Sequence, residues 1–558
     1  MIAGKSISRK VLETEEIFDE LQKNIRNISD LSNLSKTCRY FIRYFENKSI
    51  KKFVDYDYDC KIEINIDSFK TVEENYLYSE PEHPIINSPP IISKKDKYND
   101  IDTLVYGKQL SLVVALPGLK FDVTKHDYKQ IINNTFLDEI ICEIKNAEVN
   151  ISSPVILNLN HSHGFVNHII SPYIVSRYGN PSIEIIKMNL FCFLQELDQE
   201  EIFKEVDIFR GYKNFHELRI YENAALPQKN RTFDEDSLFM HVLRCLSKRK
   251  NAILRIEVPQ NGNIKLCFLT QTFKSAIELN IEIKFLISIG CKKRGFVNWR
   301  EKIKILENDI SKYITHIKCY IENQTDLLQF MKLLPDLENL SSLKIIFDEF
   351  DVRDILKNDS IIECNVISLR RLIKLKKFSI KMEHKCLEIP EYTYREICNF
   401  HNYIIRYFIS ILPSTIIFLE LENVLYLTPQ ICVLMEKFLP NIEFLFAKHV
   451  DFTNKKCLVT FKNLKYLQLY NCPLIELPRN IEFLIHKYSL SCKAPYYFGE
   501  DYDVMEESKR QKKKYILSFN KEILDITRNF SYYFNKLHKW EFYKSLVERF
   551  VVDKVKSN

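Results

Sequence analysis

Three histidines stand close together in this chain, and histidine is the residue that most often binds a metal ion. His161 and His163 follow a stretch of apolar residues at 155–159, and His168 comes soon after. Two residues apart on an extended segment, the first two side chains point to the same side and could share a metal ion. No Asp or Glu completes the set of a hydrolase, and the neighbouring Asn and Ser residues favour a solvated turn. We therefore predict no metal site and no cofactor.

Other combinations of catalytic residues are incomplete as well. The Ala-Gly-Lys-Ser at 3–6 lacks the upstream glycine of a phosphate-binding loop, and the chain has 10 glycines in 558 residues. The 15 cysteines form no Cys-x-x-Cys pair, and an odd number without paired spacing is typical of reduced thiols inside the cell. Neither a nucleophile with its base nor a pair of carboxylates can be assembled from spacing. We predict that the chain is not an enzyme.

One basic cluster, Lys509-Arg-Gln-Lys-Lys-Lys514, could contact phosphate groups or act as a nuclear-import signal. Four carboxylates at 501–507 precede it and cancel much of its field, which favours a solvated helix. The net charge is +6 with both signs interspersed, so we expect no nucleic-acid partner. No segment approaches the ~18 unbroken apolar residues of a membrane span, and charges interrupt the N-terminus. We expect a cytoplasmic or nuclear protein that does not bind membranes.

The elements that must position any functional residue repeat one apolar phrase. Its clearest copy is Leu464-x-x-Leu467-x-Leu469-x-x-Cys472. Earlier copies begin at Leu340, Leu375, Ile416 and Ile442. A unit of this kind cannot bury its apolar face alone, so we expect neighbouring units to stack into a solenoid.

Extended segments also recur before these copies. The candidate strands are Val155–Leu159, Ile183–Met188, Phe215–Tyr221, Ile253–Val258, Ile277–Ile283 and Ile314–Ile321. Between the later copies, 395–412 and 431–439 are apolar on one helical side. Strands separated by helices predict a parallel sheet and an α/β fold. An ordinary doubly wound domain is the alternative, but nothing resembles a nucleotide-binding turn, so we favour the solenoid.

The repeated phrase resembles the leucine-rich repeat, whose unit reads Leu-x-x-Leu-x-Leu-x-x-Asn/Cys-x-Leu. The copy from Leu464 to Cys472 matches it, whereas other copies replace the Asn/Cys. The replacing residues are Asp348, Glu383, Val424 and Val450. The resemblance implies a solenoid over 101–500, with parallel strands on its concave side and helices on its convex side.

The N-terminal residues 11–50 resemble a divergent F-box. Asp30-Leu-Ser-Asn-Leu-Ser-Lys-Thr-Cys-Arg-Tyr-Phe41 is similar to the second half of that motif, although its usual Leu-Pro opening is missing. Apolar residues form two helical stripes there. They are Ile17, Phe18, Leu21, Ile25, Leu31, Leu34, Cys38 and Phe41. The resemblance implies that these apolar residues bind a Skp-type adaptor, which joins a cullin scaffold. Alternatively, the stripe caps the N-terminal end of the solenoid.

In a leucine-rich strand, the residues between the buried apolar positions point to the concave surface. We predict that seven of them bind a protein substrate: Phe418, Glu420, Phe444, Phe446, Tyr466, Gln468 and Tyr470. Aromatic residues dominate protein-binding hot spots. Upstream copies carry Lys318, Lys344, Lys377 and Lys381. Such a groove would suit an acidic or phosphorylated segment with apolar anchors. A slip of one residue in the register would instead place all of them in the core.

These patterns predict four segments along the chain. They are an F-box-like helical unit at 11–50, a connecting segment with a Pro-rich linker at 51–100, the solenoid at 101–500, and a charged segment with a helical cap at 501–558, where 516–551 reads as helix. The expected function is that of a non-catalytic substrate-recognition subunit of an SCF-type cullin–RING ubiquitin ligase. The alternative is a leucine-rich-repeat protein-binding scaffold without a ligase link.

Overall fold

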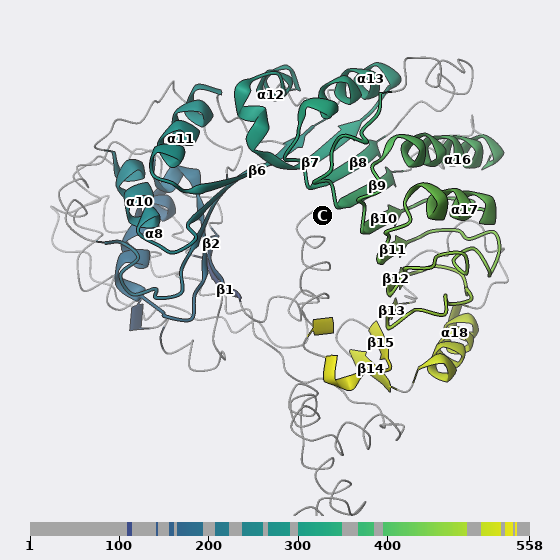
Figure 1. Cartoon of the computed structure of the whole chain (residues 1–558). Helices are drawn as coiled ribbons and strands as arrows, with labels where there is room; N and C mark the ends of the chain where they lie inside the picture. Colours follow the sequence, from purple (N-terminus) through teal and green to yellow (C-terminus); the bar gives the residue numbers. More distant parts are fainter. Residues whose placement is uncertain are drawn as a thin grey trace, which may run out of the picture. The chain divides into compact units, whose positions relative to one another are not determined.

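Short strands and helices make up most of the part of the chain that the structure describes (Figure 1). The computed structural model describes residues 109–113, 141–142, 145, 156–160, 165–193, 207–221, 237–259, 266–290, 299–348, 367–383, 394–487, 504–519, 521–525, 530–539 and 542–543. The predicted F-box-like unit at 11–50 and connecting segment at 51–100 lie outside these residues. The described residues divide near residue 320 into two compact units, here called the N-terminal and the C-terminal unit.

In the N-terminal unit, each strand pairs in parallel with the next strand along the sequence. The strands are β1 Gln109–Val113, β2 Ile156–Asn160, β3 Ile185–Asn189, β4 Glu217–Tyr221, β5 Ile253–Val258, β6 Glu282–Ile289 and β7 Ile314–Ile321. The helices are α8 Phe165–Tyr178, α10 Leu238–Ser247, α11 Leu266–Glu278 and α12 Trp299–Leu306, with short 3₁₀ turns η2 Leu190–Cys192 and η3 Asp309–Tyr313.

In the C-terminal unit, strands β8 to β13 pair in parallel in sequence order, and β15 pairs antiparallel with both β13 and β14. Its strands are β8 Ser342–Asp348, β9 Lys377–Glu383, β10 Phe418–Glu422, β11 Phe444–Lys448, β12 Tyr466–Tyr470, β13 Phe483–Lys487, β14 Lys521–Asp525 and β15 Phe530–Phe534. Its helices are α13 Gln324–Leu333, α16 Tyr394–Ile411, α17 Pro429–Phe438 and α18 Val504–Ser518, with 3₁₀ turns η4 Leu334–Asp336 and η6 Leu537–Lys539. This arrangement confirms the predicted α/β fold with parallel strands.

Within each unit, the labelled helices lie along one side of the strands (Figure 1). Alternate strand residues face them and form the core, as the two-residue period of a strand requires. Leu218 and Leu254 in one unit, and Leu419 and Leu467 in the other, are buried in this way. We call the opposite side of each sheet, away from the labelled helices, its helix-free face, and the remaining strand residues lie on it.

The ends of β10, β11 and β12 are shaped by residues in the left-handed backbone region. Asn423, His449 and Asn471 have φ of 56°, 50° and 48°. Their amides donate to the last carbonyl of the next strand, at 2.8 Å, 2.9 Å and 2.9 Å. Each turn therefore extends the backbone ladder by one hydrogen bond, and asparagine tolerates this conformation better than most residues.

Before β11, β12 and β13, an asparagine side chain links each repeat to the one before it. The amide nitrogen Nδ2 of Asn441 donates to the Ser414 carbonyl at 2.9 Å, and that of Asn463 to the Pro440 carbonyl at 2.9 Å. Asn480 makes the equivalent bond to the Lys462 carbonyl. These asparagines thus stand at strand entry, whereas the leucine-rich-repeat unit has its Asn or Cys after the strand.

Two stretches differ from the predicted elements. The candidate strand Ile277–Ile283 was wrong at its start, because α11 runs to Glu278 and Asn280 turns the chain with a φ of 54° before β6. The charged residues after 501 form α18, and the tail that reads as helix from 516 contains the antiparallel strands β14 and β15. The apolar–polar alternation that indicates a strand is not visible in Phe530–Phe534, because four of its five residues are aromatic.

Candidate functional site

A row of aromatic side chains crosses the helix-free face of the C-terminal unit. Phe418, Phe444, Tyr466 and Phe483 occupy the first positions of β10 to β13 and pair in direct register. The Phe444 and Tyr466 rings stack with their centroids 4.4 Å apart, and Phe418 lies 6.2 Å from Phe444. At the β9 end, the ammonium group of Lys377 lies 4.8 Å from the centre of the Phe418 ring. Register therefore turns separate strand residues into one continuous aromatic row.

The next row combines a buried carboxylate with an apolar end. Glu420 on β10 is 2% exposed and is paired with Lys344 on β8 at 3.2 Å. The hydroxyl of Ser379 on β9 donates to its other oxygen at 3.1 Å. Register places Phe446 and Gln468 beside Glu420 on the following strands. Glu420 therefore has an ion-pair partner on β8 and a hydrogen-bond donor on β9. It is a structural partner of Lys344 rather than a free carboxylate.

A third row alternates charges and carries a tyrosine before its last lysine. Glu422 on β10 lies 2.6 Å from Lys448 on β11 and 4.0 Å from Lys381 on β9. Burial lowers the pKa of Lys381, but Glu422, Glu383 and Glu420 outweigh it and hold that pKa above its ordinary value. The ring of Tyr470 on β12 lies between two ammonium groups, 5.8 Å from Lys448 and 5.4 Å from Lys487.

All seven residues predicted to bind a substrate lie on this helix-free face, in the three rows just described. Their exposure is uneven: Phe418, Glu420, Phe446 and Gln468 are buried, whereas Phe444, Tyr466 and Tyr470 are partly exposed. Lys344, Lys377 and Lys381 share the face, but Lys318 is on β7 of the N-terminal unit. Of the seven side chains, solvent therefore reaches mainly Phe444, Tyr466 and Tyr470.

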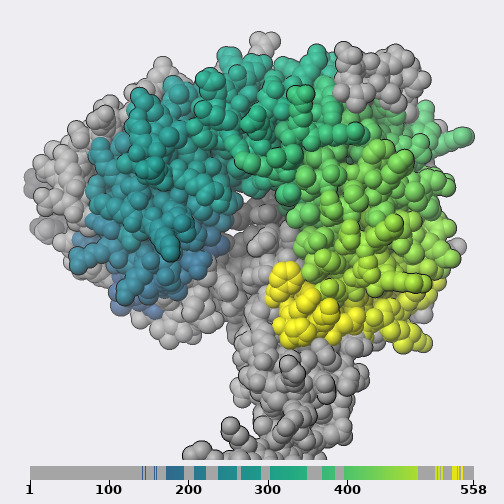
Figure 2. Space-filling model, viewed as in Figure 1, coloured from purple at the N-terminus to yellow at the C-terminus, as the bar shows by residue number. Residues whose placement is uncertain are grey.

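Part of the aromatic row is covered by the chain's own C-terminal segment. The Tyr543 ring stacks on Phe483 at 4.8 Å with an interplanar angle of 3°, and Phe542 meets Tyr466 edge-on at 5.9 Å. Lys539 forms an ion pair at 2.7 Å with Glu482, the residue directly before β13. This ion pair links the C-terminal segment to the start of that strand. Burial, together with Glu482 and Glu443, raises the pKa of Tyr466 to about 12, so it is a neutral phenol at neutral pH. In the space-filling view, the yellow C-terminal residues lie against the light-green residues that precede them (Figure 2).

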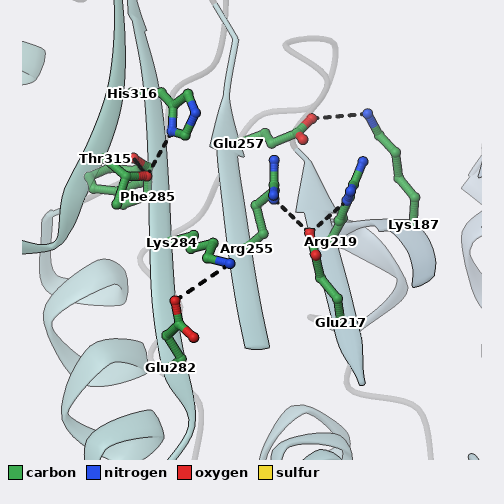
Figure 3. A network of polar contacts seen from close by, with 10 residues as sticks. All are labelled: Lys187, Glu217, Arg219, Arg255, Glu257, Glu282, Lys284, Phe285, Thr315 and His316. Carbon is green, nitrogen blue, oxygen red and sulfur yellow. Dashed lines mark hydrogen bonds and ion pairs between the residues drawn. The ribbon is translucent and has the colours of Figure 1, made fainter. Parts of the chain in front are cut away.

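Sequence reasoning missed a second polar row, on the helix-free face of the N-terminal unit (Figure 3). Lys187, Arg219, Arg255 and Lys284 stand side by side on β3 to β6. A signal was present: each follows Ile or Leu and precedes Ile, Met or Phe, so one basic residue sits in the middle of each apolar strand. Alternation then predicts that all four point away from the core.

The histidine cluster falls outside the part of the chain whose side chains the structure describes. His161 and His163, like the eight residues predicted to bind an adaptor, lie outside the described residues. Among the residues that the structure does describe, no three His, Cys, Asp or Glu side chains come together to hold a metal ion. In the same part of the chain, no helix has the length and apolar composition needed to cross a membrane.

A comparison with protein families gives one match. The model of the family described as "Domain of unknown function (DUF8346)" matches residues 141–548, which includes strands from β2 to β15. No curated protein matches the chain.

Proposed function

The chain belongs to the family described as "Domain of unknown function (DUF8346)", and we propose that it is a non-catalytic receptor that holds a segment of a partner protein. The observation that carries this proposal is the aromatic row of the C-terminal unit. Phe444 and Tyr466 are partly exposed there and are aligned by strand register, and Tyr470, in the third row, is partly exposed on the same face. Partly exposed aromatic residues on a rigid sheet provide contact area at low entropic cost, as protein-binding hot spots do.

Lysines at the ends of two rows favour a partner segment with negative charge. Lys377 lies at the β9 end of the aromatic row and Lys487 at the far end of the third row. Both ammonium groups lie over aromatic rings, which keeps them on the face. An acidic segment with apolar or aromatic anchors would complement this pattern. The repeat phrase, the parallel strands and the one-sided helices support a leucine-rich-repeat-like way of displaying such a face.

The proposal extends to a ubiquitin-ligase role through the residues that resemble an F-box. That part is supported by the sequence 30–41 alone, and its test is separate. Full-length chain is mixed with a Skp-type adaptor beside a Leu31→Asp, Leu34→Asp variant of unchanged thermal stability. We expect the adaptor to be retained by the wild type and lost by the variant. An adaptor retained by neither form would leave a receptor without a ligase link.

The binding face itself is tested by site-specific photo-crosslinking. A photoreactive amino acid at Phe444 probes the aromatic row, and the same residue at Val433, exposed on α17, probes the helix side. We expect discrete crosslinked adducts in a lysate of the source cells from position 444 only. Adducts of equal yield and mass from both positions would refute a specific receptor face.

A further inference from the structure

The basic row of the N-terminal unit has the geometry of a site rather than a scatter of surface charges. Lys187, Arg219, Arg255 and Lys284 are direct neighbours in register on four parallel strands (Figure 3). Adjacent strands lie roughly 4.8 Å apart, so the two central guanidinium groups start from neighbouring Cα positions. Their side chains are 21% and 20% exposed, which leaves them within reach of a ligand.

One buried carboxylate holds both arginines. Glu217, at the start of β4, is 5% exposed. Its oxygen Oε1 accepts from Nε of Arg219 at 2.8 Å and lies 2.7 Å from Nε of Arg255 (Figure 3). Burial raises the pKa of Glu217, but Arg219, Arg255 and Lys284 together outweigh it, so the pKa lies below its ordinary value. Glu217 is therefore ionised at neutral pH and orients the two side chains.

This contact uses only the Nε atom of each arginine. Among the described residues, the terminal nitrogens Nη1 and Nη2 of Arg219 and Arg255 have no hydrogen-bond or ion-pair partner. A guanidinium group presents these nitrogens as a planar fork that matches the oxygens of a carboxylate or phosphate. Two such guanidinium groups, held side by side by Glu217, can both donate hydrogen bonds to one tetrahedral anion.

The surrounding charges favour a compact dianion over an extended polyanion. Lys187 is held by Glu257 at 2.9 Å and lies 4.9 Å over the Tyr221 ring. Glu282 lies 3.5 Å from Lys284. With Glu217, three carboxylates oppose four cations, which leaves a net charge of +1 for the row. Nucleic acid needs a broad positive surface, whereas a phosphorylated side chain carries ≈ −1.5 to −2 on one group.

We propose that Arg219 and Arg255 bind the phosphate of a phosphorylated serine or threonine on a partner protein. The two forks donate hydrogen bonds to the phosphate oxygens, and Lys284, whose carboxylate partner is largely solvent-exposed, adds attraction at the edge. This inference rests on the proposed function in one respect only, namely that the partner is a protein. Its residues belong to the other unit and are independent of the aromatic row.

The test uses the full-length chain and two immobilised peptide libraries. Both have random residues around a central position, which is phosphoserine in one and serine in the other. We expect wild-type chain to be retained on the phosphoserine library and released by inorganic phosphate. Arg219→Ala with Arg255→Ala should reduce retention at least tenfold. Arg244→Ala on α10 is the matched control, because it removes an exposed positive charge away from this face.

A second pair of variants keeps the test valid if the alanine variants fold poorly. Arg219→Lys with Arg255→Lys preserves the charge opposite Glu217 but removes the forks, so retention should still fall several-fold at unchanged thermal stability. Equal retention of wild-type chain on both libraries, or retention that survives both pairs of variants, would overturn the phosphate site and leave the receptor function standing. Tighter binding to a single-stranded thymidine oligonucleotide than to the phosphoserine library would overturn it in favour of a nucleic-acid site.

Discussion

Gln511 on α18 lies 2.8 Å from His486 on β13, measured from Oε1 to Nε2, and both side chains are buried. His486 occupies the third apolar position of the last repeat, where Leu469 stands in the repeat before it. Gln511 also donates through Nε2 to the Cys472 carbonyl at 3.3 Å. The basic cluster 509–514 is thus a helix with one buried face, and its glutamine joins the end of the repeats to the helix that follows them.

We predict that His486 and Gln511 are coupled in stability. His486→Leu restores an apolar residue but removes the histidine that faces the buried Gln511 oxygen. The free energy of unfolding should therefore fall by about 1–3 kcal/mol. Adding Gln511→Leu should recover part of that loss, because the unpaired Gln511 oxygen is then removed, although the Cys472 carbonyl loses its donor. Urea denaturation of the two single variants and the double variant measures the coupling. Losses that simply add would contradict a direct bond.

Two glycines are expected to be irreplaceable in the N-terminal unit. Gly179 has a φ of 53°, and a Cβ built on Gly211 would lie 2.3 Å from the Gly179 Cα. Because backbone meets backbone there, Gly211→Ala should destabilise the unit by about 1–3 kcal/mol or more. Arg210→Ala, at an exposed neighbour, should change stability by less than about 0.5 kcal/mol. Thermal unfolding followed by circular dichroism compares them, and equal melting temperatures would show that the loops do not touch.

The pKa of Glu217 predicts a specific loss of stability in acid. A carboxyl with a folded-state pKa below its ordinary value of 4.5 stabilises the fold above that pH, and the contribution disappears as pH falls through the folded-state pKa. Glu217→Gln should therefore be less stable than wild type at pH 7, with the difference shrinking below about pH 4.5. Glu282→Gln, which removes a solvent-exposed partner of Lys284, is the control and should show little difference at either pH. A stability gap for Glu217→Gln that is independent of pH would refute the charge pairing.

Tyr543 and Phe542 should contribute very unequally to the covering of the aromatic row. Tyr543 is fully buried against Phe483, so Tyr543→Ala should destabilise the C-terminal unit by about 3–5 kcal/mol. Phe542 is 46% exposed, and Phe542→Ala should cost far less. Hydrogen exchange of β12 and β13 amides reports the change. Unchanged exchange in Tyr543→Ala would mean that the C-terminal segment does not hold these strands.

Much of the fold was predictable because alternation in the strands is uninterrupted. The bounds of β5 and β7 were predicted residue for residue, and the repeat copies pair as the phrase implied. Where a helix ran directly into a strand, as at Ile277, the apolar pattern could not separate them. Asn280 was the available clue, since asparagine commonly takes a positive φ.

The candidate sites were harder to predict, because they depend on contacts between distant segments. Alternation places Phe446 on the helix-free face, but its burial to 4% could not be read from its own strand. The stacking of Tyr543 on Phe483 joins residues that no periodic pattern relates. Likewise, Arg219 and Arg255 become a pair only through the register of β4 with β5 and the shared Glu217.

The central claim is that the helix-free face of the C-terminal unit captures a protein, and one comparison tests it most directly. Proteins retained by wild-type chain from a lysate of the source cells are quantified beside those retained by Phe444→Ala with Tyr470→Ala, and by Val433→Ala on α17. We predict that a defined set of partners is lost from the aromatic variant, at unchanged melting temperature, and kept by the Val433 variant. The same set retained by all three forms would contradict the claim.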